Sequence, residues 1–537
     1  MNKFKKQYIP SLSVKLFVIL LLSIFVVIPV ITMFFSMSAK DFQSVFDSPL
    51  FGEALFNSVV LSLVATVISI IIAFLLAYCV VRSQIHGKKL WNIVLTLPML
   101  IPSISHGMGF IILFGSNGII KNLFGMQGTI YGPTGIVLGS VLYAFPVAYI
   151  MLADVLKYED LSVYEAAEVL GLSKSKQFLK ITLPYVKKPL IAAFFSIFSM
   201  IVTDYGVPLM IGGKTKTVSL MMYEEVIGQL NFGKGCVYGV FLFLPAIVAF
   251  IADILNKDKA SSAFVKRNVE KKTNKFTTIF AYATCGLVSL FAILPIASFL
   301  VLAFAKSYPR DMAFTFDNIS TVFGGNGFTY VINSLLIAFI TAIVGTMLSY
   351  VMAYLTSRMK STTSKILHLM LLTFMSIPGI VLGLSYVVTF SNSFLYGTLL
   401  IIIMVNVSHF ISSPYLLMYN SFGKMNEQLE AVGQTLGISR IRMIKDVFIP
   451  QNIASLAEMF SYLFVNCMMT ISAVSFLANV NTKPLSLMIN QYEAQMQYEC
   501  AAVVSLIILA VNIAMKAIIM IAKNKFEKKE QTRNGLN

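Results

Sequence analysis

The stretch NSVVLSLVATVISIIIAFLLAYCVVR, residues 57–82, has a counterpart 276 residues later in NSLLIAFITAIVGTMLSYVMAYLTSR, residues 333–358. Each stretch begins with Asn-Ser, ends with Arg and has no Asp, Glu, Lys or Arg before that last residue. An uncharged apolar run of about 20 residues or more is typical of a helix that crosses a lipid bilayer. The pair therefore predicts membrane-spanning helices and an internal repeat.

The composition extends this prediction to the whole chain. Of the 537 residues, 57% are hydrophobic and only 12% are charged, whereas a soluble domain has roughly 25% charged residues. The apolar runs are continuous and lack the two-residue alternation of a membrane β-barrel. We therefore expect an all-α membrane protein with about twelve spans. The expected spans cover residues 15–36, 57–81, 91–114, 135–156, 188–212, 235–255, 276–305, 331–356, 366–390, 396–421, 452–479 and 500–522.

The repeat includes loops as well as spans. Ala77, Tyr78 and Pro102 recur at an offset of 276, whereas Gly171 recurs as Gly437 at an offset of 266. The difference predicts a ten-residue insertion in the Gly-rich loop 115–134 of the first half. Two tandem six-helix repeats share one orientation, because six is an even number of spans. The expected organisation is a first half over 1–255, a basic linker over 256–275, a second half over 276–522 and a tail over 523–537.

The net charge of +17 reflects topology in this interpretation and does not indicate a nucleic-acid-binding face. If the N-terminus lies inside, most Lys and Arg residues lie on the cytoplasmic side, as the positive-inside rule requires. Both termini are then cytoplasmic, and the basic residues meet lipid headgroups of the cell's inner membrane. The eight basic residues left outside are Lys40, Lys121, Lys214, Lys216, Lys234, Lys306, Arg310 and Lys483.

No motif in the chain predicts catalysis or a resident cofactor. The five cysteines and four histidines are dispersed, without a CxxC or HExxH pattern, so we expect structural roles for them. The segment from Gly228 to Lys234 fits GxxxxGK, but Gly235 replaces the Ser or Thr that would hold magnesium in a phosphate-binding loop. We therefore expect a non-enzymatic chain.

The loop after the fourth expected span reads YEDLSVYEAAEVLGLSKSKQFLKITLP, residues 158–184. Ser162 with Glu165 fits a capping box that opens a helix, and Gly171 fits a left-handed stop about two turns later. A helix of two turns is marginal in water, so it must dock on a surface. One alternative is the headgroup layer. However, the second half repeats the layout through Leu436 to Ser439, and two matched helices favour two matched protein partners.

The spacing of this loop resembles the EAA loop of binding-protein-dependent ABC importer permeases. The matching residues are Glu165, Ala166, Ala167 and Gly171, followed by the Leu-Pro pair that ends at Pro184. The resemblance implies a type I importer fold, in which loops 157–187 and 422–451 couple to two copies of a cytoplasmic ATPase that binds ATP and magnesium. It also implies an extracytoplasmic solute-binding protein.

The second loop departs from the family pattern. Ala431 replaces the motif Glu, Gly433 replaces the second Ala, and Glu430 lies one residue early, while Gly437 keeps the glycine. The resemblance therefore implies coupling through Glu430 and Gly437, with two ATPase interfaces that are not equivalent.

The fused arrangement resembles the single-chain permeases for ferric iron, thiamine and 2-aminoethylphosphonate. The stretches TDYGVPLMIGG, residues 203–213, and VIGQLNFGKG, residues 226–235, are most similar to the 2-aminoethylphosphonate group. This similarity implies a phosphonate cargo, with ferric iron, thiamine or a polyamine as alternatives.

Three polar residues inside expected spans are candidates for the translocation path, because an ionisable group costs roughly 2.5–3.5 kcal/mol to insert at a span's centre. They are Asp204 in the fifth span, and Glu458 and Asn466 in the eleventh. The alternative is a structural role through a neighbouring polar group. Thr470 replaces Asp204 in the second half.

Two other classes of protein remain open at this stage. A major-facilitator-type secondary transporter also has six plus six spans, but the segment 82–90 lacks that family's GxxxDRxGRR pattern. A membrane scaffold or insertase would not transport a solute at all.

Overall fold

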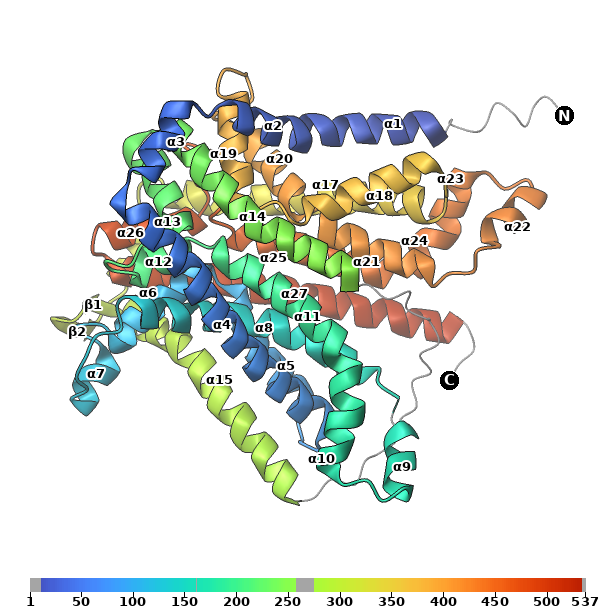
Figure 1. Ribbon diagram of the computed structural model, residues 1–537, viewed down its shortest axis with the longest axis horizontal. Helices are drawn as coiled ribbons and strands as arrows, with labels where there is room; N and C mark the ends of the chain where they lie inside the picture. The colour runs from blue at the N-terminus through green and yellow to red at the C-terminus, as the bar shows by residue number, and fades with distance from the viewer. Residues whose placement is uncertain (1–10, 161, 257–274, 534–537) are drawn as a thin grey trace. The chain divides into compact units, whose positions relative to one another are not determined.

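The computed structural model describes residues 11–160, 162–256 and 275–533 (Figure 1). Within these ranges the regular secondary structure is helical apart from one antiparallel pair, β1 (Ala305–Ser307) and β2 (Asp311–Phe314). Nine of the described helices are long and apolar enough to cross a membrane, or eleven spans if each of two bent pairs counts as one. The predicted all-α membrane fold with about twelve spans is confirmed. Of the expected linker 256–275, residues 257–274 lie outside the described ranges.

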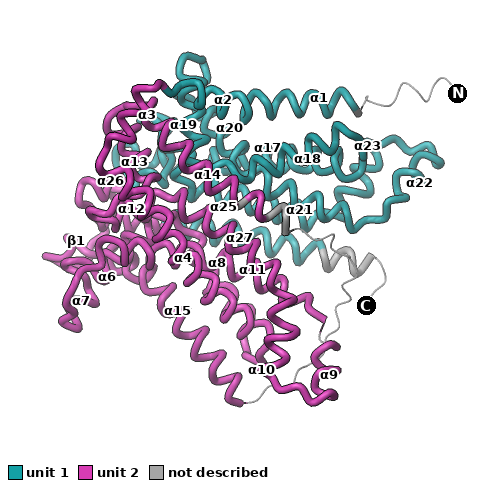
Figure 2. The backbone as a smooth tube through the Cα atoms, in the orientation of Figure 1, with its two compact units in different colours: residues 1–37, 323–488, 507–537 teal, residues 38–322, 489–506 magenta. Residues whose placement is uncertain are grey.

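The described chain divides into two compact units, and their boundaries differ from those of the linear halves (Figure 2). Unit 1 comprises residues 1–37, 323–488 and 507–537, and unit 2 comprises residues 38–322 and 489–506. Helices α16 (Asp317–Phe323), α26 (Ser486–Ala494) and α27 (Tyr498–Arg533) extend across the division.

The helices of unit 1 are α1 (Ser11–Leu22), α2 (Ile28–Phe35), α17 (Gly327–Ser357), α18 (Thr362–Phe374), α19 (Gly379–Phe390), α20 (Leu399–Phe410), α21 (Ser412–Gly423), α22 (Leu429–Thr435), α23 (Arg440–Met443), α24 (Ile449–Gln451) and α25 (Ile453–Met469). Those of unit 2 are α3 (Ala39–Phe46), α4 (Pro49–Arg82), α5 (Lys88–Thr96), α6 (Ser103–Phe114), α7 (Ile119–Phe124), α8 (Pro133–Lys157), α9 (Ser162–Val169), α10 (Lys174–Gln177), α11 (Leu183–Val202), α12 (Gly206–Ile211), α13 (Val218–Tyr223), α14 (Phe232–Asn256) and α15 (Lys275–Ala303).

The first span of the chain packs on helices of the second half. Helix α1 lies against α18, α2 lies against α19, and the π-helical turn between them (Ser23–Val27) lies against α20 (Figure 1). The Lys15 ammonium group donates to the carbonyl of Met359 at 2.7 Å, and the rings of Phe25 and Phe390 are 6.4 Å apart. One face of the first span is therefore buried within unit 1, and it includes Lys15, Leu22 and Met33.

The first span of the second half packs on helices of the first half in the same manner. Helix α15 lies against α4, α5 and α6. The His86 N–H donates to the Tyr282 hydroxyl at 2.7 Å, and the rings of Phe110 and Phe291 are 5.4 Å apart. Because each half contributes its first span to the other unit, the linear repeats and the compact units do not coincide.

Prolines break two of the expected spans. The span expected at 91–114 is α5, a 3-10 turn (Leu97–Leu100) and α6, with Ile101 extended before Pro102. The span expected at 366–390 is α18 and α19, which meet at 106° around Pro378. Proline disfavours a helical conformation in the residue before it and lacks the N–H that the helix needs.

The Asn-Ser pair at the start of each quoted stretch fastens a distant loop to the helix. The Asn57 side-chain amide donates to the carbonyl of Lys216 at 3.1 Å, and the Ser58 hydroxyl accepts from the N–H of Val218 at 2.8 Å. The corresponding bonds in the second half join Asn333 to Asn481 and Ser334 to Leu485. These Asn and Ser side chains thus satisfy loop backbone groups.

The same two helices are unusually long. Helix α4 has 34 residues and α17 has 31, which gives lengths of about 50 Å at 1.5 Å per residue. The hydrocarbon core of a bilayer is only about 30 Å thick. Each helix is therefore longer than that layer is thick, and Arg82, the last residue of α4, and Arg358, the C-cap of α17, lie at corresponding ends.

The predicted insertion lies where the repeat offset placed it. The connection between α6 and α8 runs over residues 115–132 and contains α7, whereas the connection between α19 and α20 runs over residues 391–398.

Candidate functional site

The loop that follows α8 in unit 2 folds as the sequence predicts, with a short helix ended by a glycine. Gly171 has φ +72°. The N–H of Leu172 donates to the carbonyl of Ala167 at 2.9 Å, and that of Gly171 to Glu168 at 3.0 Å. This pair of bonds is a Schellman motif, which satisfies the last carbonyls of α9.

The loop that follows α21 in unit 1 repeats this motif. Gly437 has φ +67°. The N–H of Ile438 donates to the carbonyl of Gly433 at 2.8 Å, and that of Gly437 to Gln434 at 3.1 Å. The two short helices α9 and α22 therefore end in the same way, even though their sequences differ.

The start of α9 differs from the expected capping box. Ser162 is the first helical residue, and its N–H donates to Asp160 Oδ1 at 2.9 Å. The second loop has the same arrangement, because the N–H of Gln428 donates to Asn426 Oδ1 at 2.9 Å. Asp160 and Asn426 occupy equivalent positions of the repeat, and such side chains commonly bond the backbone two residues on.

Most of the motif residues of α9 face outward. Glu165, Ala166 and Glu168 are exposed, whereas Ala167 is buried. The helix ends in two apolar residues that are also exposed, Val169 at 89% and Leu170 at 76%. An exposed apolar pair at the end of a two-turn helix is a feature of a docking surface.

The exposed face of α22 is uncharged and lacks the acidic residues of α9. Ala431, Val432 and Leu436 are exposed together with the uncharged polar residues Gln434 and Thr435, and Leu436 is the counterpart of Leu170. Gly433, the counterpart of Ala167, is buried, and a Cβ built on it would lie 2.1 Å from Met443 Sδ. The Met443 side chain fills the space that a Cβ would need, which explains why this position departs from the EAA pattern.

A buried arginine lies under each short helix. At the end of α4, Arg82 forms an ion pair with Glu159, and the two side chains are 9% and 3% exposed. The guanidinium carbon lies 4.5 Å from the centre of the Tyr164 ring. The Tyr164 hydroxyl donates to the other oxygen of Glu159. Burial, followed by this hydrogen bond, raises the pKa of Tyr164 to about 12, so the hydroxyl stays a donor.

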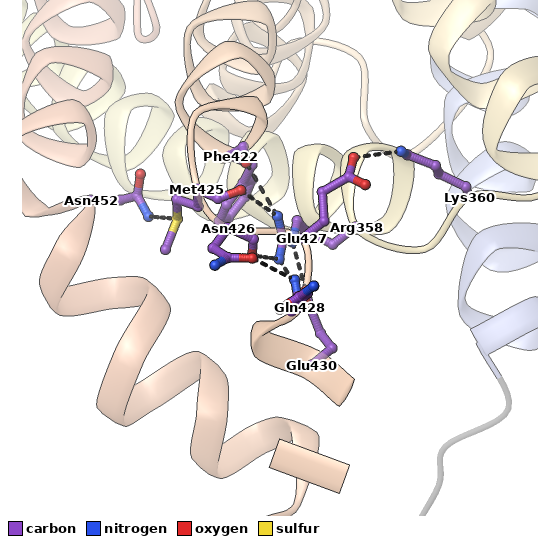
Figure 3. A network of polar contacts seen from close by, with 9 residues as sticks. All are labelled: Arg358, Lys360, Phe422, Met425, Asn426, Glu427, Gln428, Glu430 and Asn452. Carbon is purple, nitrogen blue, oxygen red and sulfur yellow. Dashed lines mark hydrogen bonds and ion pairs between the residues drawn. The ribbon is translucent and has the colours of Figure 1, made fainter. Parts of the chain in front are cut away.

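The arginine of unit 1 has more partners. Arg358 Nε donates to Glu430 Oε1 at 2.6 Å, and Nη2 bonds the second oxygen of Glu430 (Figure 3). The hydrogen bond with Glu430 raises the pKa of Arg358. The guanidinium carbon lies 5.5 Å from the centre of the Phe448 ring. Further donations from Arg358 reach the carbonyls of Phe422, Met425 and Asn426, as Figure 3 shows.

Arg82 and Arg358 have the same kinds of partner, although the partners come from different positions of the repeat. Glu430 is the counterpart of Tyr164, and Met425 is the counterpart of Glu159. Each arginine therefore lies between a carboxylate and an aromatic ring. The sequence contained a signal for the arginines, because both end the quoted repeat. It contained no signal for their carboxylate partners, because Glu159 and Glu430 are not at equivalent positions.

The residues expected to couple to an ATPase thus fall into two groups. Glu165, Ala166 and the glycines Gly171 and Gly437 lie on the exposed side of their loops. Glu430 instead pairs with Arg358, where its side chain is only 19% exposed. Ala167 lies on the buried side of α9.

Asp204 caps a helix. Its carboxylate accepts from the Ser103 hydroxyl at 2.6 Å through Oδ1 and from the N–H of Val207 at 2.9 Å through Oδ2. The Ser219 hydroxyl donates to the Asp204 carbonyl at 2.8 Å. Asp204 therefore joins the start of α12 to the start of α6, and both carboxylate oxygens have partners.

The other two translocation-path candidates lie on α25 of unit 1. Glu458 accepts from the Lys523 ammonium group at 2.5 Å, and the Asn466 amide donates to the carbonyl of Tyr462 at 2.8 Å. Eight residues separate them along the helix. Each of the two side chains therefore has a hydrogen-bond partner within unit 1.

The segment that resembles a phosphate-binding loop has another structure. Gly228 ends the π-helical turn Glu224–Gly228, and α14 begins four residues later at Phe232. It follows a helix, whereas a phosphate-binding loop follows a strand. Among the described residues, no group of three or more His, Cys, Asp or Glu could hold a metal ion.

Comparison with known families identifies the class of this chain. A family described as "Binding-protein-dependent transport system inner membrane component" matches residues 69–257 and 345–528. The two matches cover more than half of the chain, one in each linear half. The chain belongs to this family and is an ABC importer permease with both halves fused in one polypeptide.

Curated relatives match across both halves. A putative ferric transport system permease protein of Haemophilus influenzae is 23% identical over 490 residues, which cover 87% of this chain and 78% of the relative. A ferric transport system permease protein of Actinobacillus pleuropneumoniae is 22% identical over 522 residues, 93% of this chain and 76% of the relative. A molybdenum transport system permease protein of H. influenzae is 28% identical over 182 residues, 32% of this chain and 80% of the relative.

A solved structure of a bacterial alginate ABC transporter in complex with a pentasaccharide-bound periplasmic protein is 18% identical, with a TM-score of 0.38. The match covers 45% of this chain and 91% of that chain. The predicted class is thus confirmed by the family and the permease relatives, whereas the predicted phosphonate cargo is not supported by the relatives named here.

Proposed function

We propose that the chain is the membrane subunit of an ATP-driven importer and that α9 and α22 are its contacts with two copies of a cytoplasmic ATPase. The single observation that carries this proposal is the matched pair of short helices, each ended by a left-handed glycine and each presenting exposed apolar residues. Helices of this length need a docking surface. ATP and magnesium would be bound by the partner, and this chain would contribute no catalytic residue.

The two contacts differ in chemistry. Glu165 and Glu168 give the first an acidic edge beside Val169 and Leu170, whereas the exposed residues of the second carry no charge: Ala431, Val432, Gln434, Thr435 and Leu436. We therefore propose that the first contact includes a charge pair with the ATPase and that the contact through α22 does not. Glu430 does not belong to the second contact, because it pairs with Arg358.

Both loops and both termini lie on the cytoplasmic side of the inner membrane in this proposal. The distribution of Lys and Arg supports this orientation. On the opposite side, a solute-binding protein would deliver the cargo.

Ferric iron is the cargo that the comparisons favour. The two ferric permease relatives cover 87% and 93% of this chain, so they match both halves. The molybdenum permease covers 32%, which is less than one half. A phosphonate, the cargo implied by residues 203–213 and 226–235, is the alternative.

Purification from native membranes tests the class. A photo-crosslinker at Ala166 should capture a companion that a photoreactive ATP analogue labels, while the same crosslinker at Phe35, an exposed residue in a span, should not. Uptake should fail when ATP is depleted and persist when only the proton gradient is collapsed. The reverse dependence would identify a secondary transporter, and the absence of any uptake would favour a scaffold.

Competition tests the cargo. Cells that depend on this chain should accumulate radioactive ferric iron supplied through the extracytoplasmic binding protein, and excess 2-aminoethylphosphonate should not compete. Accumulation of the phosphonate in place of iron would reverse the assignment without affecting the proposed class.

A further inference from the structure

We infer that Arg82 and Arg358 are positioning residues that fasten the coupling helices α9 and α22 to the ends of the spans α4 and α17. This inference rests on the proposed function, since it specifies how a movement of the ATPase enters the membrane part of the chain.

The same local chemistry is built twice from different residues. In unit 2 the carboxylate comes from Glu159, before α9, and the aromatic ring from Tyr164, within it. In unit 1 the carboxylate comes from Glu430, within α22, and the ring from Phe448, which follows α23. The arginine alone keeps its position in the repeat. We call each arginine, together with its carboxylate and its aromatic ring, a clamp. The clamp is present in both units although its carboxylate and ring come from different positions, which indicates that the connection itself has a function.

Ordinary termination of a span by a basic residue does not explain these contacts. A terminal arginine normally extends its charged group into water or toward lipid headgroups. Here the guanidinium groups are turned inward, and the side chains of Arg82 and Arg358 are 9% and 4% exposed. Burial of a charge is costly unless it is paired, so each arginine is held where its carboxylate lies.

The clamp connects a weakly supported element to a rigid one. Helices α9 and α22 have eight and seven residues, too few to hold their position alone. Helices α4 and α17 have 34 and 31 residues and cross the membrane. A displacement of either short helix is therefore passed by the arginine to one end of a long span.

The two clamps are unequal. Arg358 donates to the Glu430 carboxylate and to three backbone carbonyls. Arg82 Nε and Nη1 have no hydrogen-bond partner among the described residues, and Arg82 borders a cavity of about 210 Å³ together with Lys174 and Gln177. The connection in unit 2 is therefore the looser of the two.

Relocating the carboxylate tests the inference in the full complex with its ATPase. Glu159→Met should lower the ratio of cargo-stimulated to basal ATP hydrolysis and should lower uptake by about 5- to 150-fold, the usual range of coupling between two sites. Glu159→Met with Tyr164→Glu moves the carboxylate to the position that it has in unit 1, with Thr182 where unit 1 has Phe448, and should restore both. Arg82→Gln and Arg358→Gln should resemble Glu159→Met, and Arg82→Lys should recover only part of the loss because it lacks the planar fork.

Matched controls are Lys89→Gln and Lys365→Gln, which remove exposed charges from α5 and α18 and should leave the ratio unchanged. Normal uptake in both arginine variants would overturn the inference, as would a double variant that assembles but does not recover. If Glu159→Met prevents assembly, restored assembly and uptake in the double variant support the clamp, and failure of both overturns it. Failure of the proposed function looks different, because then the unaltered chain neither retains an ATPase nor takes up solute in an ATP-dependent way.

Discussion

Tyr164 and Glu430 occupy the same position in the two halves of the chain, and both contact the arginine that ends the second span of their half. Tyr164 does so with the face of its ring, 4.5 Å from the Arg82 guanidinium carbon. Glu430 does so with its carboxylate, 2.6 Å from Arg358 Nε. A position that appears unrelated in the two sequences therefore has one role, which is to hold a short helix against a long one.

Removing the arginine of unit 1 should destabilise that unit. Loss of one partner of a fully buried ion pair costs about 3–5 kcal/mol, and Arg358→Gln should cost somewhat less, about 2 kcal/mol, because Glu430 is 19% exposed. Thermal unfolding in detergent would measure the change. Lys360→Gln breaks the neighbouring pair with Glu427, in which both side chains are more than 70% exposed, and should leave the unfolding temperature unchanged. Equal decreases in the unfolding temperature for Arg358→Gln and Lys360→Gln would contradict the difference in burial between the two ion pairs.

The glycines that end the short helices should be sensitive to any Cβ. Gly171 and Gly437 have φ of +72° and +67°, where a residue with a side chain costs roughly 1–2 kcal/mol and asparagine costs less. We expect uptake to fall in the order Gly, Asn, Ala, Pro at position 171, with normal membrane insertion throughout. Proline should be worst, because its φ is fixed near −65° and it removes the N–H that bonds Glu168.

Gly423→Ala is the matched control for that series, since this glycine has no positive φ and nothing within 4 Å of a built Cβ. Uptake by Gly171→Pro equal to that of the unaltered chain would refute the coupling role of α9.

The spans and the Gly171 turn could be predicted from the sequence because each depends on local properties. An uncharged run of apolar residues requires a membrane, and a glycine two turns after a helix start favours a left-handed end. The clamp could not be predicted, because it joins Arg82 to residues more than 70 positions away and because its carboxylate shifts position between the repeats. The packing of each half's first span on helices of the other half could not be predicted either, because the sequence of an apolar helix does not indicate which helices it contacts.

The departure from the EAA pattern at Gly433 predicts a pair of substitutions that compensate each other. In the second loop Gly433 leaves room for Met443, and in the first loop Ala167 lies at the position of Gly433 and Gln177 at that of Met443. Gly433→Ala should cost about 1 kcal/mol, at the low end for overpacking, because the end of a methionine side chain can move. Gly433→Ala with Met443→Gln should recover most of that loss, since Gln177 bonds the Leu172 carbonyl at 2.9 Å in the first loop.

A double-mutant cycle on thermal stability would measure this recovery. Strictly additive effects of the two substitutions would show that the positions do not interact and would leave the altered motif of the second loop without a packing explanation.

Two substitutions at Asp204 distinguish a structural role in capping α12 from a role in the translocation path. Its two oxygens are occupied by the Ser103 hydroxyl and the Val207 N–H. Asp204→Asn keeps one acceptor of the same shape, so we expect uptake close to that of the unaltered chain. Asp204→Ala removes the cap of α12 and should cost about 0.5–2 kcal/mol, with a matching fall in thermal stability. If Asp204→Asn instead abolishes uptake at unchanged stability, the negative charge itself acts on the cargo or on its path, because shape and packing are the same in the two side chains.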